Sequence, residues 1–311
     1  MEEIKPKLAI IGATGYIGKF ITAGFITALH ANKLSELRVL STKSSDITKG
    51  FADQGVKVQI VDFTATPTLV AAFTGIDIVV STLGTGPGTK ESKLAILDAL
   101  AASKVKIYFP SEFGTNHYDR CKNYQHDVFE AKKDHFRQAQ AKGIKTIALL
   151  CSLIMESSFG KWFGLDTAAE VWTLVGKGET PVAVCAEGDI GHFAVEAALK
   201  AFKDPTNFPD FVEVYSDMKT MKEYAQAFDN VAGRSTKLEF TPMEQALAHY
   251  ESTHHQFEYL LQILFEEGAF DCSDAKNKGN ELLNPGELVW KLKKIEEYAQ
   301  ETQGRPWKDF S

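Results

Sequence analysis

The stretch that decides the fold is Leu8-Ala9-Ile10-Ile11-Gly12-Ala13-Thr14-Gly15-Tyr16-Ile17-Gly18. A continuous apolar run stands directly before three glycines of the form G-x-x-G-x-x-G, and apolar residues at helical spacing follow over 16–29. This order is typical of a strand buried on both faces, a tight turn and a helix. In such a turn the glycines permit a sharp bend, a close approach of backbone to a pyrophosphate and close helix–sheet packing. The stretch therefore predicts a dinucleotide-binding loop at a helix N-terminus, with a purely structural turn as the alternative.

The rest of the first half alternates short apolar runs with helical patterns. Strands are predicted over 37–40, 56–61, 76–80, 105–109 and 146–150, and helices over 66–73, 90–102 and 127–141. Such alternation predicts an α/β fold of the Rossmann type, a doubly wound parallel sheet with helices on both faces. In these sheets a ligand lies beyond the carboxyl ends of the strands, so each loop at those ends is a candidate site.

The second half is less regular. Helices are predicted over 189–202, 221–231, 243–267 and 286–300, and a strand over 211–215. We expect residues 1–155 to form an NAD(P)-binding Rossmann domain. Residues 156–311 should form a smaller, mostly helical substrate lobe, with some segments returning to the Rossmann sheet.

Composition excludes several classes of protein. The chain has 311 residues, 44% hydrophobic and 24% charged, with a formal net charge of −7. The negative charge gives no bulk attraction for nucleic acid, and no apolar run approaches the ~20 residues of a membrane span. We therefore expect no nucleic-acid or membrane partner. The four cysteines are widely spaced and look like reduced thiols, which predicts a cytoplasmic protein.

The segment after the second strand indicates which dinucleotide is preferred. An NAD enzyme usually places an acidic residue there, but this chain has no carboxylate before Asp46. Lys43 offers a charge and Thr42 a hydroxyl, which suits the 2′-phosphate of NADP. The alternative is that Lys43 is an ordinary solvated lysine.

Further candidate residues follow the third and fourth strands. Asp62 and Phe63 end the third strand, where an adenine edge would lie, and Asp62 is equally suited to capping the loop before the next helix. Ser81, Thr82, Leu83 and Gly84 end the fourth strand, and their small side chains would admit a ribose.

Four motifs together resemble one known family. Gly12–Gly18, Val61-Asp62, Ser81–Gly84 and Phe109–Gly114 are similar to the NmrA-like, isoflavone-reductase-like branch of the atypical short-chain dehydrogenases. The resemblance covers nearly the whole chain and includes Asp189-Ile190-Gly191 at a helix start. It implies a Rossmann domain, NADPH as hydride donor and a variable substrate lobe. It also implies cofactor contacts from the residues after the fifth strand, Pro110, Ser111, Glu112 and Phe113.

The resemblance assigns a catalytic lysine. Phe129-Glu130-Ala131-Lys132 followed by Gly143-Ile144 matches the register of the family's catalytic lysine at Lys132. Lys132 shares a helix face with Val128 and Phe136, so it should reach either the cofactor cleft or Glu112 at the helix edge, whereas Lys133 should be solvated. The segment Cys151–Glu156 departs from the plant pattern and looks fungal, so the reaction class transfers better than the substrate.

Aromatic and apolar residues near the expected nicotinamide end predict a pocket for an aromatic substrate. Its candidates are Phe113, Ile154, Met155, Phe159 and Trp162, with ordinary core packing as the alternative. Two Y-x-x-x-K spacings, Tyr118/Lys122 and Tyr215/Lys219, fit the pattern of classical short-chain dehydrogenases, but chance matches are expected in this composition. Tyr118 falls in a polar loop rather than on the helix, so it is the less favoured catalytic alternative. The histidines, including His249, His254 and His255, show no metal-binding spacing, so no metal is expected.

The sequence thus predicts an NADPH-dependent reductase of a small aromatic or conjugated substrate, a carbonyl, an enone or a quinone methide, with Lys132 as general acid or base. The protein should be a monomer or homodimer. The alternative is a non-catalytic NAD(P)-binding redox sensor that acts through a protein partner. Such sensors tend to lack the helix lysine, so Lys132 favours the enzyme.

Overall fold

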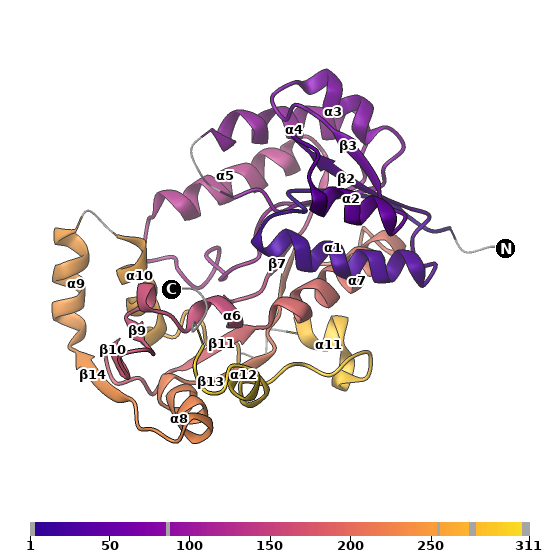
Figure 1. The fold of residues 1–311 in the computed structure, drawn as a ribbon. Helices are drawn as coiled ribbons and strands as arrows, with labels where there is room; N and C mark the ends of the chain where they lie inside the picture. Colours follow the sequence, from indigo (N-terminus) through magenta and orange to yellow (C-terminus); the bar gives the residue numbers. More distant parts are fainter. Residues whose placement is uncertain (1–3, 85–87, 254–255, 274–277, 307–311) are drawn as a thin grey trace. The chain divides into compact units, whose positions relative to one another are not determined.

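A computed structural model describes residues 4–84, 88–253, 256–273 and 278–306 (Figure 1). The chain forms two compact units. The first unit holds the residues up to Phe113 together with Asp127–Leu149 and Ile190–Val212. The second unit holds Gly114–His126, Leu150–Asp189 and the residues from Glu213 onward.

The first unit contains a six-stranded parallel sheet in the order β3-β2-β1-β4-β5-β6. The strands are β1 (Lys7–Ile11), β2 (Glu36–Ser41), β3 (Lys57–Ile60), β4 (Ile78–Ser81), β5 (Ile107–Phe109) and β6 (Lys145–Thr146). The strand order reverses between β1 and β4, which is where doubly wound sheets open a crevice for a ligand. The predicted fold class is confirmed.

Helices cover both faces of this sheet. Figure 1 shows α3, α4 and α5 over one face and α1 and α7 over the other. Their bounds are α1 (Tyr16–His30), α3 (Thr66–Phe73), α4 (Thr89–Ala102), α5 (Asp127–Ala141) and α7 (Glu187–Lys203). A further helix, α2 (Asp46–Asp53), was not predicted from the sequence, because it is short and polar. A capping box between Ser45 and Thr48 stabilises its N-terminus.

Helices α1 and α7 touch through their backbones. A Cβ atom on Gly24 would lie 2.9 Å from the carbonyl oxygen of Gly191, and one on Gly191 would lie 2.6 Å from that of Phe20. This contact gives a physical reason for the glycine in the Asp189-Ile190-Gly191 motif, since any side chain there would push the helices apart.

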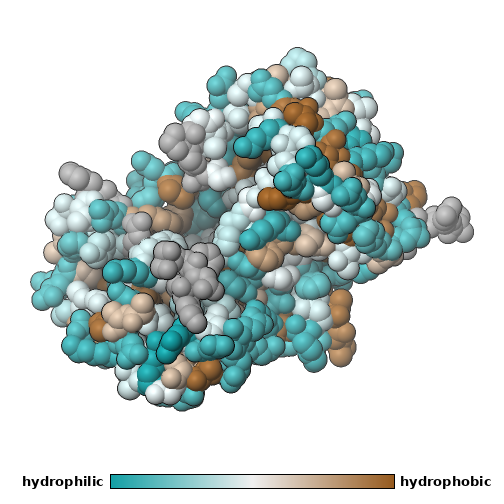
Figure 2. Space-filling model, in the orientation of Figure 1, coloured by the Kyte–Doolittle hydropathy of each residue, from teal (hydrophilic) through white to brown (hydrophobic). Residues whose placement is uncertain are grey.

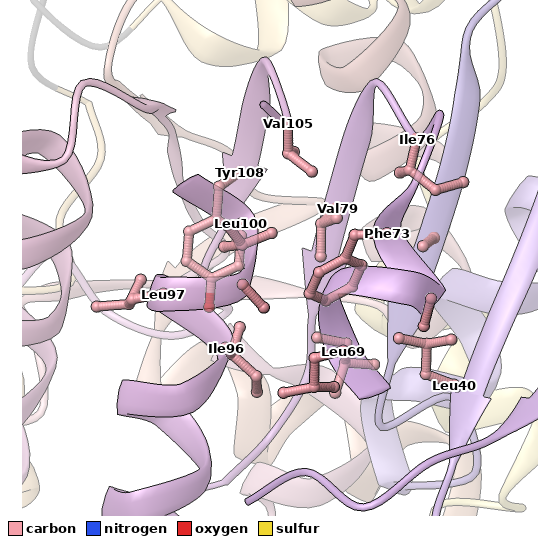
Figure 3. Packing of buried hydrophobic residues seen from close by; sticks show 14 of the residues in the cluster. Leu40, Leu69, Phe73, Ile76, Val79, Ile96, Leu97, Leu100, Val105 and Tyr108 are labelled. Atoms are coloured by element: carbon pink, nitrogen blue, oxygen red, sulfur yellow. The ribbon is translucent and has the colours of Figure 1, made fainter. Parts of the chain in front are cut away.

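A hydrophobic cluster holds α3 and α4 on the sheet (Figure 3). Leu69 and Phe73 of α3 and Ile96 and Leu100 of α4 are completely buried against Val79 of β4. Close packing of this kind resists displacement of any one element. It therefore fixes the positions of the strand ends that carry the candidate site.

One predicted strand is divided. The run 146–150 forms β6, which pairs with β5, and β7 (Ala148–Leu150), which pairs with β12 (Phe211–Glu213). The backbone nitrogen of Ile147, between them, still donates to the carbonyl oxygen of Tyr108. The apolar run was recognised correctly, but its change of pairing partner has no local signal.

The second unit contains two three-stranded sheets, β14-β10-β9 and β13-β11-β8, in addition to helices. The strands are β8 (Leu153–Ile154), β9 (Leu165–Asp166), β10 (Val171–Val175), β11 (Pro181–Cys185), β13 (Asp217–Thr220) and β14 (Lys237–Thr241). The helical elements are α6 (Met155–Ser158), η1 (Lys161–Phe163), α8 (Met221–Ala232), α9 (Met243–Ser252), α10 (Phe257–Glu266), α11 (Gly279–Leu283), η2 (Pro285–Glu287) and α12 (Ile295–Glu301).

Two helix predictions for this unit were wrong in extent. The predicted helix 243–267 is two helices, because Ser252 and Thr253 donate their hydroxyls to the carbonyl oxygen of His249 and end α9 there. The predicted helix 286–300 begins only at Ile295. In the segment before this helix, the side-chain oxygen of Asn284 accepts the backbone N–H of Val289 at 3.1 Å.

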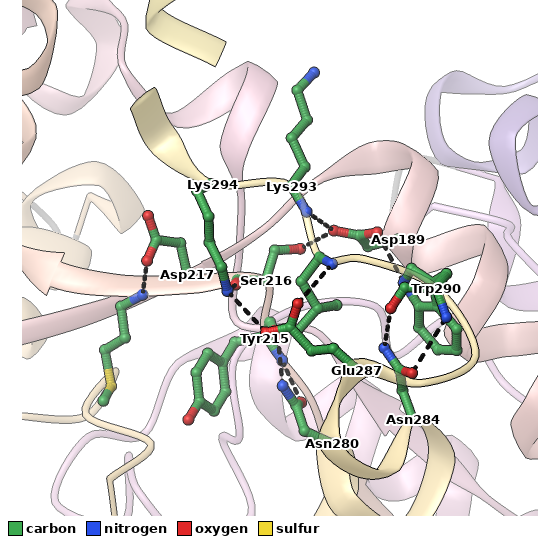
Figure 4. Close-up of polar contacts among 12 residues, drawn as sticks. Asp189, Tyr215, Ser216, Asp217, Asn280, Asn284, Glu287, Trp290, Lys293 and Lys294 are labelled. Carbon is green, nitrogen blue, oxygen red and sulfur yellow. Dashed lines mark hydrogen bonds and ion pairs between the residues drawn. The ribbon is translucent and has the colours of Figure 1, made fainter. Parts of the chain in front are cut away.

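Asp189 secures the irregular segment before α12 (Figure 4). Its carboxylate accepts hydrogen bonds from the Ser216 hydroxyl at 2.6 Å, the Trp290 indole at 3.0 Å and the Lys293 backbone nitrogen at 3.0 Å. Buried carboxylates are stabilised by such donors, and the donors in turn hold the segment without regular secondary structure.

The surface and the cysteines agree with the composition. On the face shown in Figure 2, hydrophobic side chains form small separate patches among hydrophilic ones. All four cysteines are buried thiols outside any disulfide. Among the described residues, no helix combines the length and the apolar character that a membrane span needs.

Candidate functional site

The glycine loop lies between β1 and α1, as predicted. Gly12 has a φ of +80°, and its carbonyl oxygen accepts the backbone N–H of Gly15 at 2.9 Å. A Cβ atom on Gly18 would lie 2.1 Å from that carbonyl oxygen, and one on Gly12 would lie 2.6 Å from the Thr82 hydroxyl. These two glycines are therefore required by the turn and by its contact with the end of β4.

Gly15 differs from the other two glycines of the loop. A Cβ atom there would meet only the carbonyl oxygen of Gly12, at 3.2 Å, and the residue itself is exposed. Gly15 is also the N-cap of α1, with no side-chain cap and no acidic residue in the first helical turn. The open helix end presents the positive end of its dipole, which suits a phosphate group.

The turn after β2 lies next to this loop, because Ile11 of β1 pairs with Leu40 of β2. The Ser41 hydroxyl donates to the carbonyl oxygen of Lys43 at 2.9 Å and closes the turn. Thr42 and Lys43 are exposed there. The turn therefore offers an ammonium group and a hydroxyl to solvent beside the glycine loop.

Asp62 forms the predicted loop cap. One of its carboxylate oxygens accepts the backbone N–H of Thr64 at 2.8 Å and its hydroxyl at 2.7 Å. These hydrogen bonds lower the pKa of the Asp62 carboxyl. Phe63 is buried in the hydrophobic cluster beside Leu69. Contacts of Asp62 and Phe63 with a cofactor stay predictions.

The residues after β4 connect that strand to β1. Both the backbone nitrogen and the hydroxyl of Thr82 donate to the carbonyl oxygen of Ile11, at 2.9 and 3.0 Å. Ser81 is buried, and Leu83 is partly buried. A Cβ atom on Gly84 would meet nothing within 4 Å. These hydrogen bonds hold the carboxyl ends of β1 and β4 side by side.

Lys132 of α5 reaches the residues that follow β5. Its ammonium nitrogen donates to the carbonyl oxygen of Ser111 at 2.8 Å and lies 3.8 Å from a carboxylate oxygen of Glu112. The Glu112 side chain is only 2% exposed and that of Lys132 is 20% exposed. Lys132 therefore lies next to Glu112, as one of the two alternatives predicted, and its contact with a cofactor stays a prediction.

Lys133 is not solvated as expected. Its side chain is also 20% exposed, and its ammonium group lies 2.9 Å from Glu130 one turn earlier on α5. The helix rotation of about 100° per residue separates the two lysines as predicted, but the second finds a partner on its own helix.

A buried polar pair beneath this site was missed by sequence reasoning. The Tyr108 hydroxyl of β5 lies 2.9 Å from Nε2 of His135 on α5. Burial, followed by the charge of Lys93, lowers the pKa of His135 to about 4, so the imidazole is neutral at pH 7. Burial likewise raises the pKa of Tyr108. The only sequence signal was that His135 lies three residues after Lys132, close to the predicted apolar face.

The predicted substrate residues other than Phe113 belong to the second unit. Met155 and Phe159 are buried, and the Phe159 ring packs against Tyr224 and Phe228 with centroids 5.0 Å apart in each pair. Trp162 is 47% exposed. Ile154 is partly buried, and Phe113, in the first unit, is buried. Contact of these residues with a substrate stays a prediction.

The lysines of the two Y-x-x-x-K spacings each lie next to a carboxylate, and a catalytic role of Tyr118 stays a prediction. Lys122 makes an ion pair with Asp119, and Lys219 makes one with Glu296 at 3.1 Å. No three His, Cys, Asp or Glu side chains of the described residues are grouped to hold a metal. His254 and His255 lie outside the described residues.

Comparison with known proteins identifies the family. Residues 4–299 match the model of the NmrA-like family. The chain belongs to the NmrA-like family. This NmrA-like protein is 26% identical to an isoflavone reductase-like protein of Olea europaea over 88% of this chain and 89% of that protein. It is also 26% identical to phenylcoumaran benzylic ether reductase Pyrc5 of Pyrus communis, over 83% and 85%. The resemblance predicted from the motifs is confirmed.

Solved structures share the fold of this NmrA-like protein. AtPrR2 with NADP+ and (+)-pinoresinol aligns with a TM-score of 0.80 and 20% identity, over 96% of this chain and 99% of that one. The binary complex of leucoanthocyanidin reductase and NADPH from Vitis vinifera aligns with a TM-score of 0.78 and 19% identity, over the same shares.

Proposed function

We propose that this NmrA-like protein is an NADPH-dependent reductase of small aromatic or conjugated molecules. One observation carries the proposal: a single compact unit holds both features that the reaction needs. The glycine loop leads into the uncapped N-terminus of α1, and Lys132 is hydrogen-bonded to Ser111 at the strand ends. The names of similar proteins support the reaction class, since they include benzylic ether reductases and isoflavone reductase-like proteins. Two structures of the same fold were solved with NADP+ or NADPH.

The residues of the first unit fit NADPH. The exposed glycine loop and the open N-terminus of α1 have the donor chemistry that a pyrophosphate requires. We assign Lys43 and Thr42 to the 2′-phosphate, because a lysine ammonium group makes strong charge-assisted hydrogen bonds to phosphate. Further cofactor contacts are assigned to Asp62, Phe63, Ser81–Gly84 and Pro110–Phe113. When bound, NADPH supplies a hydride.

Lys132 provides the proton that the reaction needs. Reduction of a carbonyl or an enone leaves negative charge on oxygen, and an ammonium group close by stabilises that charge and donates a proton, directly or through water. The hydrogen bond to Ser111 and the nearby carboxylate of Glu112 restrict the side chain of Lys132. Lys132 is therefore assigned as the general acid, and as the base in the reverse direction.

The substrate class follows from the aromatic residues and from similar proteins. We assign Phe113, Ile154, Met155, Phe159 and Trp162 to the substrate pocket. Eugenol synthase 1 of Petunia hybrida is 26% identical over 78% of this chain and 80% of that protein. A conjugated aromatic substrate agrees with the aromatic residues assigned to the pocket and with the names of the similar proteins. We further propose a cytoplasmic monomer or homodimer that binds no nucleic acid.

The test is a turnover assay. Purified protein is mixed with NADPH and a panel of aromatic enones, quinones and aldehydes, and the loss of NADPH absorbance is followed. Turnover of at least one aromatic substrate, with NADPH strongly preferred over NADH, is the expected result. Tight cofactor binding without turnover on any substrate, together with capture of a protein partner, would instead identify a redox sensor.

A further inference from the structure

A second candidate binding site lies within the first unit, at the amino end of β1. A surface pocket of about 440 Å³ lies between the segment before β1, the residues that follow α1 and the last turns of α7. This volume falls in the range of roughly 300–1,000 Å³ typical of small-molecule sites. The glycine loop is at the other end of α1, and this helix of 15 residues is about 22 Å long. The pocket is therefore separate from the strand ends that carry the glycine loop and Lys132.

Lysines dominate the polar part of this pocket. Lys5, Lys33, Lys200 and Lys203 line it, and Glu196 is the one carboxylate among the described residues of the lining. Glu196 lies 3.3 Å from the ammonium nitrogen of Lys33, so these two charges offset each other. Within the part of the chain that the structure describes, Lys5 and Lys200 form no ion pair. The pocket therefore carries an excess of positive charge, which an anion would neutralise.

Stabilisation of a helix end does not account for this arrangement. The C-terminal end of α7 carries a partial negative charge, which Lys200 and Lys203 in its last turn stabilise. Lys5 precedes β1 and belongs to no helix, yet it lines the same pocket. Two separate segments thus contribute cations to one concave surface, which is the chemistry of an anion site.

Apolar side chains form much of the remaining lining. They come from Ile4 and Pro6 before β1 and from Leu199 and Phe202 of α7. Ile4 is 82% exposed, and Leu199 and Phe202 are partly exposed. Covering this surface removes apolar area from water and so favours a ligand with an apolar body. An inorganic anion would leave it uncovered.

We propose that this pocket binds an amphipathic organic acid, in which a carboxylate is attached to an alkyl chain of medium length. Lys5 and Lys200 hold the carboxylate through charge-assisted hydrogen bonds, and the chain covers Ile4, Leu199 and Phe202. The inference goes beyond the proposed function, because this binding requires neither NADPH nor Lys132.

The experiment measures binding to the whole protein by calorimetric titration. The probe is octanoate. Octanamide is its neutral counterpart, and butanoate keeps the charge but has a shorter chain. Octanoate is expected to bind about tenfold or more tightly than either, because each counterpart lacks one part of the interaction. Raising NaCl from about 0.05 M to about 0.5 M should weaken octanoate several fold, since salt screens exposed charges.

Substitutions in the lining locate the binding site. Lys5→Gln and Lys200→Gln should each weaken octanoate binding by about tenfold. The matched control is Lys49→Gln, which removes one positive charge from the exposed surface of α2 in the same unit but outside the pocket. It should change the affinity by less than about twofold. Thermal unfolding of each variant checks that it is folded.

Several outcomes would overturn the inference. These are equal affinities for octanoate and octanamide, no binding of octanoate, or equal effects of Lys200→Gln and Lys49→Gln. Saturating NADPH should leave octanoate affinity unchanged, and competition between the two would place octanoate in the proposed cofactor site and overturn the inference. If a lysine variant does not fold, the three probes and this competition in the unmodified protein still decide.

Failure here and failure of the proposed function are distinguishable. Turnover of NADPH without octanoate binding would contradict only this inference. Octanoate binding that depends on Lys5 and Lys200, without turnover of NADPH on any substrate, would support this inference and contradict only the proposed function.

Discussion

The ammonium nitrogen of Lys132 lies 2.8 Å from the carbonyl oxygen of Ser111, so a helix side chain is held at the carboxyl end of β5. The next residue, Lys133, is equally exposed but pairs with Glu130 on the same helix. Two adjacent lysines of one helix thus have similar burial and different surroundings. They form a matched pair for testing which of them takes part in chemistry.

The first prediction follows from this pair. Lys132→Met removes the proposed proton donor and should lower kcat by about 10²–10⁴-fold, while NADPH affinity changes only a few fold. Lys133→Met, the control, should leave kcat within a few fold. Steady-state kinetics and cofactor titration measure both. A kcat that survives Lys132→Met would remove Lys132 from catalysis.

The second prediction concerns the 2′-phosphate. Lys43→Glu replaces attraction by repulsion and should weaken NADPH binding by about 10- to 100-fold while NADH binding changes little. The control is Lys49→Glu, on the exposed surface of α2 where Lys49 pairs with Asp46 at 3.0 Å. Fluorescence titration with both cofactors measures the effect. Equal losses for NADPH and NADH would place Lys43 away from the phosphate.

The third prediction separates two glycines of one loop. Gly15→Val should abolish cofactor binding in a folded protein, because the side chain projects where the phosphate would approach and meets little protein. Gly18→Val should instead lower the melting temperature, since its Cβ would lie 2.1 Å from a backbone oxygen. Thermal unfolding and NADPH titration of each variant distinguish the two roles. Normal NADPH affinity in Gly15→Val would reduce the loop to a structural turn.

The fourth prediction is a pH dependence of stability. His135 has a pKa of about 4 in the folded protein against an ordinary value of 6.5, so the unfolded chain binds the extra proton first as pH falls. The free energy of unfolding is therefore highest above pH 6.5, where His135 is neutral in both states, and it falls as pH falls from 6.5 toward about 4. Between about pH 7.5 and pH 5 the free energy of unfolding should fall by about 2 kcal/mol because of His135.

Urea unfolding at several pH values measures this contribution. In His135→Gln the corresponding part of the pH dependence should disappear, because glutamine does not titrate. The control is His30→Gln, in which the substituted histidine lies at the exposed end of α1. If His135→Gln and the unmodified protein lose stability in parallel, another group causes the dependence.

The fifth prediction tests the contacts of Asp189. Asp189→Ala removes the acceptor of hydrogen bonds from Ser216, Trp290 and Lys293 and should lower the free energy of unfolding by about 2–3 kcal/mol. Asp53→Ala, at the exposed end of α2, should change it by less than about 0.5 kcal/mol. Denaturant unfolding provides both values. Equal stability of the two variants would show that the segment is held by other contacts.

Several elements were predictable because their signals are local. The apolar run Leu8–Ile11 before Gly12 identified the first strand and its loop, since a strand buried on both faces requires such a run. The helices 66–73 and 127–141 were predicted with their exact bounds because apolar spacing and end signals coincide there. The sequence likewise showed the glycines that the loop requires. It also contained the motifs that led to the NmrA-like family.

The sequence by itself determined the alternation of strands and helices, the glycine loop and the helix that carries Lys132, because each depends on residues a few positions apart. Only the tertiary structure decided that Tyr108 meets His135, that Asp189 holds a segment a hundred residues later, and that Lys5 and Lys200 line one pocket. The physical reason is that periodicity records whether a residue is buried. It does not record which distant residue buries it, since that partner is set only when the whole chain has packed.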